Sequence, residues 1–487
     1  MTDPDPDPAS QEGAPGERAA VGVDEWVARS GERQESLPGP LGAVQRAFGR
    51  VGWWPRLAAA VVVGAIIPQF GLNDFQFQIG INMLLLALLA VGLNISVGWA
   101  GLLDLGYIAF YGFGAYGFAL LSSSQIGGGI HWPAYASVPV VMIAAGVLGL
   151  LVGLPSRRLL GDYLAIVTLF FGEAFVEFTN NVASGTLGGP NGITSIDPYK
   201  GFGAQITTNK GYFYLLLVLL AVVCAAVHML DRSRLGRAWR AVREDPLAAG
   251  LMTIPVNRVK LMAFSFGAAI AALAGTVFAA QQISVFPTDF DTPFLILIYA
   301  ALILGGAGSI GGAVIGGLII AITLDGFLRS PTQSGYIFYG MIALTLVVKL
   351  RPWRKLAAVA TTIVVFGLAM HAIVSAVSAS SVAGGPQSSG WIADVVRHWV
   401  IVPSNPTGPG NIGFVILICA LIAIVQLRGR WRTMLIVPTV YLAVCVWEAR
   451  LVGQPAITRQ LLIGAILIVM MNARPQGLLG ARRVEIV

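Results

Sequence analysis

Long apolar runs separated by short polar loops make up most of the chain after residue 56. An α-helix needs about 20 apolar residues to cross the hydrocarbon core of a bilayer, and the runs lack the alternating pattern of a membrane β-barrel. We therefore predict an all-α fold, a polytopic transmembrane helical bundle. About ten spans are expected near residues 57–70, 79–97, 105–122, 135–154, 163–180, 212–230, 259–281, 293–305, 312–328 and 336–350. About four more are expected near residues 357–378, 412–427, 433–450 and 459–473.

Two apolar regions contain too much glycine to form straight helical rods. They read NISVGWAGLLDLGYIAFYGFGAYGFALL, residues 94–121, and ILGGAGSIGGAVIGG, residues 303–317. Irregular backbone at membrane depth is tolerated only where it is buried in protein or lines a cavity. We expect broken or re-entrant helices here. The alternative is that the glycines serve close helix packing without any ligand.

The charges indicate the orientation of the chain. Charged residues make up 11% of the sequence, with a net charge of +7. The arginines gather in loops that all fall on one side of the membrane when the spans alternate, as the positive-inside rule requires. This accounts for the positive charge without a nucleic-acid partner. We expect a multi-pass protein of the plasma (inner) membrane with both termini cytoplasmic.

The first 50 residues are rich in Pro, Asp, Glu, Gly and Ala and cannot bury enough apolar surface to become ordered. They predict a disordered cytoplasmic tail, and they lack the basic start and apolar core of a signal peptide. The three cysteines all fall in apolar spans, and the four histidines lie far apart, so neither a disulfide framework nor a metal site is indicated. No Gly-Lys pair occurs, which excludes a phosphate-binding loop, so we expect no ATP or other cofactor in this chain.

Acidic residues inside apolar runs are candidates for function. Asp104 lies within GLLDLGY, and a carboxylate at the bilayer centre costs about 2.5 to 3.5 kcal/mol. The predicted topology puts it close to the cytoplasmic edge, which lowers this cost. Glu173 and Glu177 are four residues apart and share one helical face. We expect Glu173, the deeper of the two, to have a polar role inside the bundle, and Glu177 to lie at the outer interface.

The stretch SRLGRAWRAVREDPLAAGLMTIPVNRVK, residues 233–260, interrupts the apolar pattern. Apolar residues at positions i, i+4 and i+7 predict an amphipathic helix over 233–243. Asp245 is a good N-cap and Pro246 a good first helical residue, so LAAGLM reads as a second short helix. Pro255 should end it, and Asn257 should cap the next span. The result is a helix-break-helix whose small residues, Ala248, Ala249 and Gly250, would let another protein approach closely.

Six segments, in order, resemble one family. They are residues 101–121, 159–175, 187–193 (LGGPNGI), 259–279, 302–317 and 474–480 (RPQGLLG), and REDPLAA followed by IPV resembles the cytoplasmic coupling loop of the same family. The chain is similar to the permeases of branched-chain amino acid ABC importers (LivM-type family). The resemblance implies two ABC ATPase subunits that use ATP and Mg²⁺, a second permease subunit, an extracytoplasmic substrate-binding protein and surrounding membrane lipid as partners.

The resemblance also implies two groups of site residues. ATPase coupling would involve Arg240, Arg243, Glu244, Asp245, Ala248, Ala249 and Gly250. The translocation pathway would involve Asp104, Tyr107, Glu173, Gly188, Asn191, Gly305 and Gly306. The chain departs from the family pattern in having Phe170 and Thr253 where glycines are common, and Val176 where an arginine is frequent.

The predicted domains follow from the same comparison. They are a tail (1–50), a permease core (51–330) containing the coupling loop (231–258), a set of inserted transmembrane helices (331–458), and a terminal helix with a basic cytoplasmic tail (459–487). The predicted function is ATP-driven import of branched-chain or related neutral amino acids, with no enzymatic activity in this chain. The alternatives are an ABC permease for urea or amides and a secondary transporter driven by an ion gradient.

Overall fold

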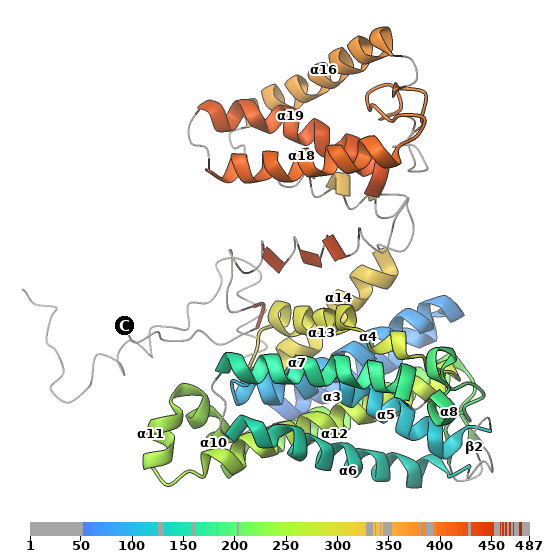
Figure 1. Ribbon diagram of the computed structural model, residues 1–487, viewed down its shortest axis with the longest axis vertical. Coiled ribbons are helices and arrows are strands. Elements are labelled where there is room, and N and C mark those ends of the chain that lie inside the picture. Colours follow the sequence, from blue (N-terminus) through green and yellow to red (C-terminus); the bar gives the residue numbers. More distant parts are fainter. Residues whose placement is uncertain are drawn as a thin grey trace, which may run out of the picture. The chain divides into compact units, whose positions relative to one another are not determined.

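The computed structural model describes residues 52–124, 131–157, 161–182, 184–201, 204–327, 353–378, 381–385, 396–426 and 430–451, with scattered positions in 335–343, at 394 and in 458–479. The tail 1–50 lies outside these residues, and only scattered positions of the spans expected near 336–350 and 459–473 are among them. Helices joined by short loops make up the described part, apart from one hairpin of two-residue strands, Lys200–Gly201 (β1) with Ala204–Gln205 (β2), and two isolated β-bridges. The all-α prediction is confirmed (Figure 1).

The helices follow the predicted spans closely. Within the described ranges, nine are long and apolar enough to cross a membrane, and two shorter apolar helices accompany them. The first helix, α3 (Trp53–Ile66), belongs to a compact unit of its own that ends at Ile66. The main helices of the next region are α4 (Asp74–Leu93), α5 (Tyr107–Ser122), α6 (Ala134–Gly153), α7 (Gly161–Glu177), α9 (Asn209–Arg232), α12 (Val256–Gln282), α13 (Thr292–Gly305) and α14 (Ile310–Ala321).

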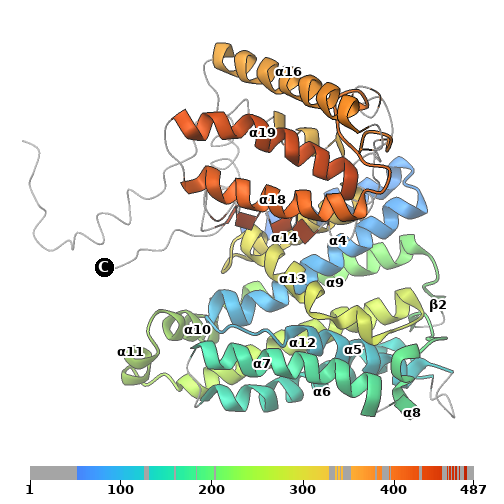
Figure 2. The ribbon, with the colours of Figure 1, turned by 45° about the horizontal axis from the view of Figure 1, so that its top comes forward.

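Short elements connect these helices. They are η1 (Ile67–Phe70), η2 (Asn94–Trp99), η3 (Leu154–Arg157), η4 (Phe178–Val182), α8 (Ser184–Leu187), η5 (Gly189–Asn191), α10 (Arg234–Glu244), α11 (Pro246–Leu251), η6 (Pro287–Phe290) and η7 (Ile322–Phe327). The helices α10 and α11 lie at one end of this group, and α8 and β2 lie at the opposite end (Figures 1 and 2).

Small residues bring the central helices into backbone contact. A Cβ added to Gly114 of α5 would lie 2.3 Å from the carbonyl oxygen of Ala272 in α12, and one added to Gly275 would lie 2.1 Å from that of Tyr111. A Cβ on Gly316 of α14 would lie 1.9 Å from the carbonyl oxygen of Ala301 in α13. At these positions glycine serves close helix packing, as small residues do in membrane bundles.

Both glycine-rich regions are broken, as expected. After α4 the chain forms a π-helical turn, η2, and then unwinds through Gly101, whose φ of +69° favours glycine, before α5 begins. After α13 the chain reverses through Gly306 and Gly308, with φ of +110° and +94°. The next helix, α14, starts where the hydroxyl of Ser309 accepts a hydrogen bond from the Gly312 amide at 3.1 Å. We call residues 305–309 the α13–α14 loop.

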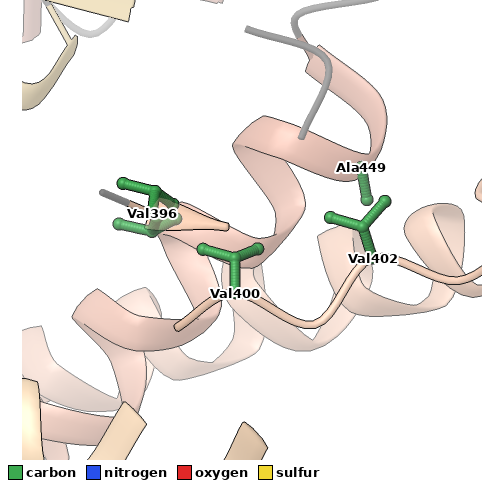
Figure 3. Close-up of a cluster of buried hydrophobic side chains, with 5 residues drawn as sticks. Val396, Val400, Val402 and Ala449 are labelled. Atoms are coloured by element: carbon green, nitrogen blue, oxygen red, sulfur yellow. The ribbon is translucent and has the colours of Figure 1, made fainter. Parts of the chain in front are cut away.

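The C-terminal region forms a separate helical group of α16 (Trp353–Val377), α18 (Thr407–Gln426), α19 (Arg430–Val446) and the π-helical turn η9 (Trp447–Leu451). Five buried residues form its small core: Val396, Val400, Val402, Val444 and Ala449. Figure 3 shows Val400 and Val402 on an extended segment that packs against the helical turn of Ala449. The indole nitrogen of Trp399 donates to the Val364 carbonyl of α16 at 3.1 Å. Residues 396–402 therefore pack onto these helices.

Candidate functional site

The helix-break-helix of residues 233–258 is present, and its two helices are capped by side chains. The Ser233 hydroxyl accepts a hydrogen bond from the Leu235 amide at 3.1 Å at the start of α10. The Asp245 carboxylate accepts hydrogen bonds from the amides of Leu247 (2.8 Å) and Ala248 (3.1 Å) at the start of α11. The break is therefore fixed by an N-cap, as predicted.

The connection from α11 to α12 differs from the prediction in one respect. The next helix begins at Val256 with Pro255 in the N-cap position and no side-chain cap, so the expectation that Asn257 caps it is wrong. The proline fixes φ at a value suited to helix entry, and its carbonyl accepts a hydrogen bond from the Val259 amide at 3.1 Å. Thr253, in the turn between the helices, has φ of +65°, a left-handed conformation that normally selects glycine.

The tip of the break carries exposed apolar side chains. Leu247 is 82% exposed and Leu251 is 85% exposed, and Glu244, Asp245, Ala248 and Gly250 are exposed around them. Ala249 is only 4% exposed, so the expectation that it lies on the accessible surface is wrong: it is on the inner side of α11. We call the exposed residues Glu244, Asp245, Leu247, Ala248, Gly250 and Leu251 the coupling surface.

The two arginines expected in the coupling group have intramolecular contacts. Arg240 forms an ion pair with Asp231 near the end of α9. The side chain of Arg243 runs along the backbone of two glycines: a Cβ added to Gly101 would lie 2.8 Å from Arg243 Cγ, and one added to Gly308 would lie 3.4 Å from Nη1. Arg243 therefore connects α10 to both helix breaks and is directed inward.

Trp239 anchors α10 in the bundle. Its side chain is fully buried, and its indole nitrogen donates to the Val259 carbonyl of α12 at 2.7 Å. Its ring stacks on Trp99 of η2, with ring centroids 6.2 Å apart, and meets the edge of Phe266. Movement of α10 would therefore move an aromatic pair at the end of the broken helix.

The α13–α14 loop is held by η2. The Gly308 amide donates to Asn94 Oδ1 at 2.7 Å, and the Gly308 carbonyl accepts from Trp99 Nε1 at 3.1 Å. Sequence reasoning did not single out Asn94, Trp99 or Gly308. The signal that could have found them is a polar Asn and a Trp within the apolar run NISVGW.

Gly305 and Gly306, expected in the pathway, are packing positions. Both are buried, and a Cβ on Gly305 would lie 1.9 Å from the Gly312 carbonyl oxygen. Two residues of RPQGLLG also bond to the end of α13: the amides of Leu478 and Leu479 donate to the carbonyls of Leu304 and Gly305, each at 2.9 Å.

Asp104 and Tyr107 are enclosed at the start of α5. Asp104 is 1% exposed, and its carboxylate accepts from the Gly106 amide at 3.2 Å while its carbonyl accepts from Tyr299 Oη at 2.8 Å. The Tyr107 hydroxyl donates to the Leu89 carbonyl at 3.0 Å. These hydrogen bonds stabilise the non-helical segment between η2 and α5.

Glu173 lies on the exposed face of α7, so the expectation that it points into this chain's own bundle is wrong. The inward face of α7 is formed by residues such as Thr168, whose hydroxyl accepts from the Leu105 amide at 3.0 Å. The Glu173 carboxylate accepts a hydrogen bond from the Thr292 hydroxyl at the start of α13. The same exposed face carries Tyr163, Ile166, Phe170 and Glu177.

Gly188 and Asn191 lie at the end of the bundle opposite to α10. Gly188 has φ of +77°, and Asn191 is exposed in the tight turn that follows. Ile193, two residues after Asn191, pairs with Val285 through two backbone hydrogen bonds of 3.0 and 2.9 Å. The expected pathway residues thus occupy four places and do not form one site. Among the described residues, no three His, Cys, Asp or Glu side chains are grouped to hold a metal ion.

Comparison with known proteins identifies the family. The profile of the family "Branched-chain amino acid transport system / permease component" matches residues 76–348. The permease protein LivM of the high-affinity branched-chain amino acid transport system of Escherichia coli K12 is 33% identical over 61% of this chain and 72% of its own length, and its Salmonella typhimurium counterpart matches equally. The permease LivH of the E. coli system is 29% identical over 54% of this chain and 88% of its own length.

No solved structure is significantly similar to the chain. The family profile covers more than half of the sequence, and it spans α4 to α14, the part of the chain that contains both helix breaks and the helix-break-helix. The apolar helices and these relatives together make the protein a multi-pass membrane protein. The chain belongs to the family of permease components of branched-chain amino acid transport systems.

Proposed function

We propose that this chain is the membrane-spanning permease subunit of an ATP-driven importer for branched-chain or related neutral amino acids. Separate ATPase subunits bind the coupling surface and use ATP and Mg²⁺. The observation that carries the proposal is the exposed apolar tip, Leu247 and Leu251, on a short capped helix whose base is anchored by the buried Trp239. Burying each leucine against a partner would contribute about 1.5 to 3 kcal/mol.

The exposed face of α7 supports a second permease subunit beside this one. Glu173 lies near the middle of the apolar helix Tyr163–Asn181 and on its exposed side. A carboxylate facing lipid at that depth costs about 2.5 to 3.5 kcal/mol, so this face is covered by protein or by a water-filled path. The translocation pathway then runs along α7, between two permease subunits.

The orientation follows from the coupling surface. In this proposal the end that carries α10 and α11 faces the cytoplasm, as do both termini, and the arginine-rich loops support this orientation by the positive-inside rule. The opposite end, with Gly188, Asn191 and the bridge between Ile193 and Val285, faces outward and receives the extracytoplasmic binding protein.

The test is co-purification of ATPase subunits with variants of the full chain from its native membrane. Leu251→Asp places a charge at the centre of the coupling surface and should reduce ATPase recovery at least about tenfold, because it removes the apolar contact. Phe70→Asp is the matched control: Phe70 is 81% exposed, and its neighbour Gln69 bonds to Tyr214 near the start of α9, whereas α10 follows the end of α9. Equal recovery with both variants would contradict the docking assignment. Recovery of the wild-type chain without any ATPase would favour a gradient-driven transporter, for which Glu173 would be the relevant carboxylate.

A further inference from the structure

The backbone amide and the backbone carbonyl of Gly308 both form hydrogen bonds with side chains of η2. Its amide is bound by Asn94 and its carbonyl by Trp99, the first and last residues of the same π-helical turn. Gly308 also has φ of +94°, a backbone conformation that residues other than glycine rarely adopt. The position of the α13–α14 loop is therefore tied to the shape of η2.

The π-helical turn is packed so that it cannot shift gradually. A Cβ added to Gly98 would lie 1.9 Å from Asn94 Oδ1 and 2.7 Å from the Gly308 amide nitrogen. The Asn94 side chain and the Gly308 backbone therefore leave no room for a side chain at residue 98. Single π-helical turns inside α-helices are rare and are frequent at functional sites. Packed interiors change between discrete arrangements instead of deforming continuously.

Asn94 is only half satisfied in this arrangement. The side chain is 0% exposed, and its Nδ2 finds no acceptor among the residues that the structure describes. Asn94 Oδ1, in contrast, makes a short bond to Gly308. A buried donor without an acceptor is unfavourable, so a second arrangement of η2 that supplies a carbonyl to Nδ2 would compete with the observed one.

The other end of η2 is connected to the coupling surface. Trp99 stacks on Trp239, and α10, which carries Trp239, continues directly into α11 through the Asp245 cap. A displacement of α10 therefore acts on Trp99, on the same turn that holds Gly308.

We propose that Asn94 is the positioning residue that couples movement of α10 to the α13–α14 loop, with η2 as the two-state element. In the observed state Asn94 holds the Gly308 amide. When an ATPase displaces α10, Trp239 moves and Trp99 moves with it. The π-helical turn η2 then rearranges and Asn94 releases the Gly308 amide. The helices α13 and α14 move together away from η2. This inference rests on the proposed function for the source of the displacement, but the bond between Asn94 and Gly308 is a property of this chain alone.

The first experiment measures hydrogen exchange of the Gly308 amide in the purified full chain. Asn94→Ala removes the acceptor and should speed exchange at residues 305–309 about tenfold or more, because the amide loses its bond. Asn94→Asp keeps an acceptor oxygen at the same place and should restore protection. Asn82→Ala is the matched control: Asn82 lies in α4, which runs directly into η2, and its Nδ2 donates to Asp325 at 2.8 Å, away from this loop. Unchanged exchange in Asn94→Ala would overturn the assignment.

The second experiment measures ATP hydrolysed per substrate molecule imported by the reconstituted complex. Asn94→Ala should raise this ratio about tenfold with normal subunit assembly, and Asn82→Ala should not. An unchanged ratio in Asn94→Ala, or an equal rise in both variants, would overturn the coupling role. If the wild-type complex neither binds nor uses ATP, the proposed function fails, and the exchange result still decides whether Asn94 holds the loop.

Discussion

Thr292, the first residue of α13, donates a hydrogen bond from its hydroxyl to the carboxylate of Glu173 on the exposed face of α7. This bond connects α7 with α13. Its acceptor, the Glu173 carboxylate, lies near the middle of the apolar helix Tyr163–Asn181. Because the side chain is not enclosed by this chain, its surroundings in the assembly decide whether the charge is tolerated.

The first prediction concerns this charge. Glu173→Gln keeps an oxygen that can accept the Thr292 hydrogen bond and removes the charge, so membrane insertion and abundance should be normal. If α7 lines the pathway, uptake should fall about tenfold, since the electrostatic interaction with a passing polar solute is lost.

The control is Glu177→Gln, four residues further along the same face. Glu177 accepts a hydrogen bond from Asn181 at 2.5 Å, at the end of the span, and its loss should change uptake less than twofold. Radiolabelled amino acid uptake into proteoliposomes at matched protein abundance measures both. Normal uptake in Glu173→Gln would remove the carboxylate from the pathway.

The second prediction concerns the C-terminal segment. The Leu478 amide donates to the Leu304 carbonyl, so this segment caps the end of α13 beside Gly306. Leu478→Pro removes the donor, whereas Leu478→Ala shortens the side chain and keeps it. We expect Leu478→Pro to lower stability by about 1 to 3 kcal/mol and to reduce uptake, and Leu478→Ala to have a small effect, because the Leu478 side chain is exposed. Equal effects of the two variants in thermal unfolding would show that the amide is unimportant.

Among the described residues, the sequence was sufficient for the helices, the two helix breaks and the capped turn at Asp245, because these depend on local patterns: apolar runs, glycine density and capping chemistry. The sequence did not predict which face of a helix is covered by a neighbouring helix. Glu173 and Ala249 were placed on the wrong sides of their helices, since one helix alone does not indicate its neighbours. Asn94 and Gly308 are 214 residues apart, and no local pattern connects them.

The third prediction concerns the strained turn after α11. Thr253 has φ of +65°, which costs a β-branched residue about 1 to 2 kcal/mol. Thr253→Gly should remove most of this cost and stabilise the turn by about 0.5 to 1 kcal/mol, after the entropy loss of glycine is counted. Thr253→Ala retains the strain and should give no gain. Local hydrogen exchange across residues 246–256 measures the difference, and slower exchange in Thr253→Ala than in Thr253→Gly would contradict it.

The fourth prediction separates charge from capping on the coupling surface. Glu244 and Asp245 are the acidic pair of the coupling surface, and Asp245 also caps α11. Asp245→Ala should therefore destabilise α11 by about 1 kcal/mol, while Asp245→Asn keeps a capping oxygen and loses the charge. We expect Glu244→Lys combined with Asp245→Asn to abolish ATP-dependent uptake with α11 still folded, as measured by uptake and by exchange at residues 246–251. Uptake at the wild-type level would exclude the charges from ATPase coupling.

The last prediction concerns acid stability at the opposite end of the bundle. Asp197 pairs with Lys200 at 2.8 Å and with His131 at 2.6 Å. Partial burial raises the pKa of Asp197, but the hydrogen bonds and charges of Lys200 and His131 outweigh it, so the pKa lies below its usual value. A carboxylate with a lowered pKa stabilises the folded state above its unfolded pKa of about 4, and this contribution is lost as the pH falls through the folded value. Fluorescence of Trp132, next to His131 and 42% exposed, should therefore change as the pH falls below about 4. Asp197→Asn should lack the acid transition, and a transition that persists unchanged in Asp197→Asn would show that another group governs this loop.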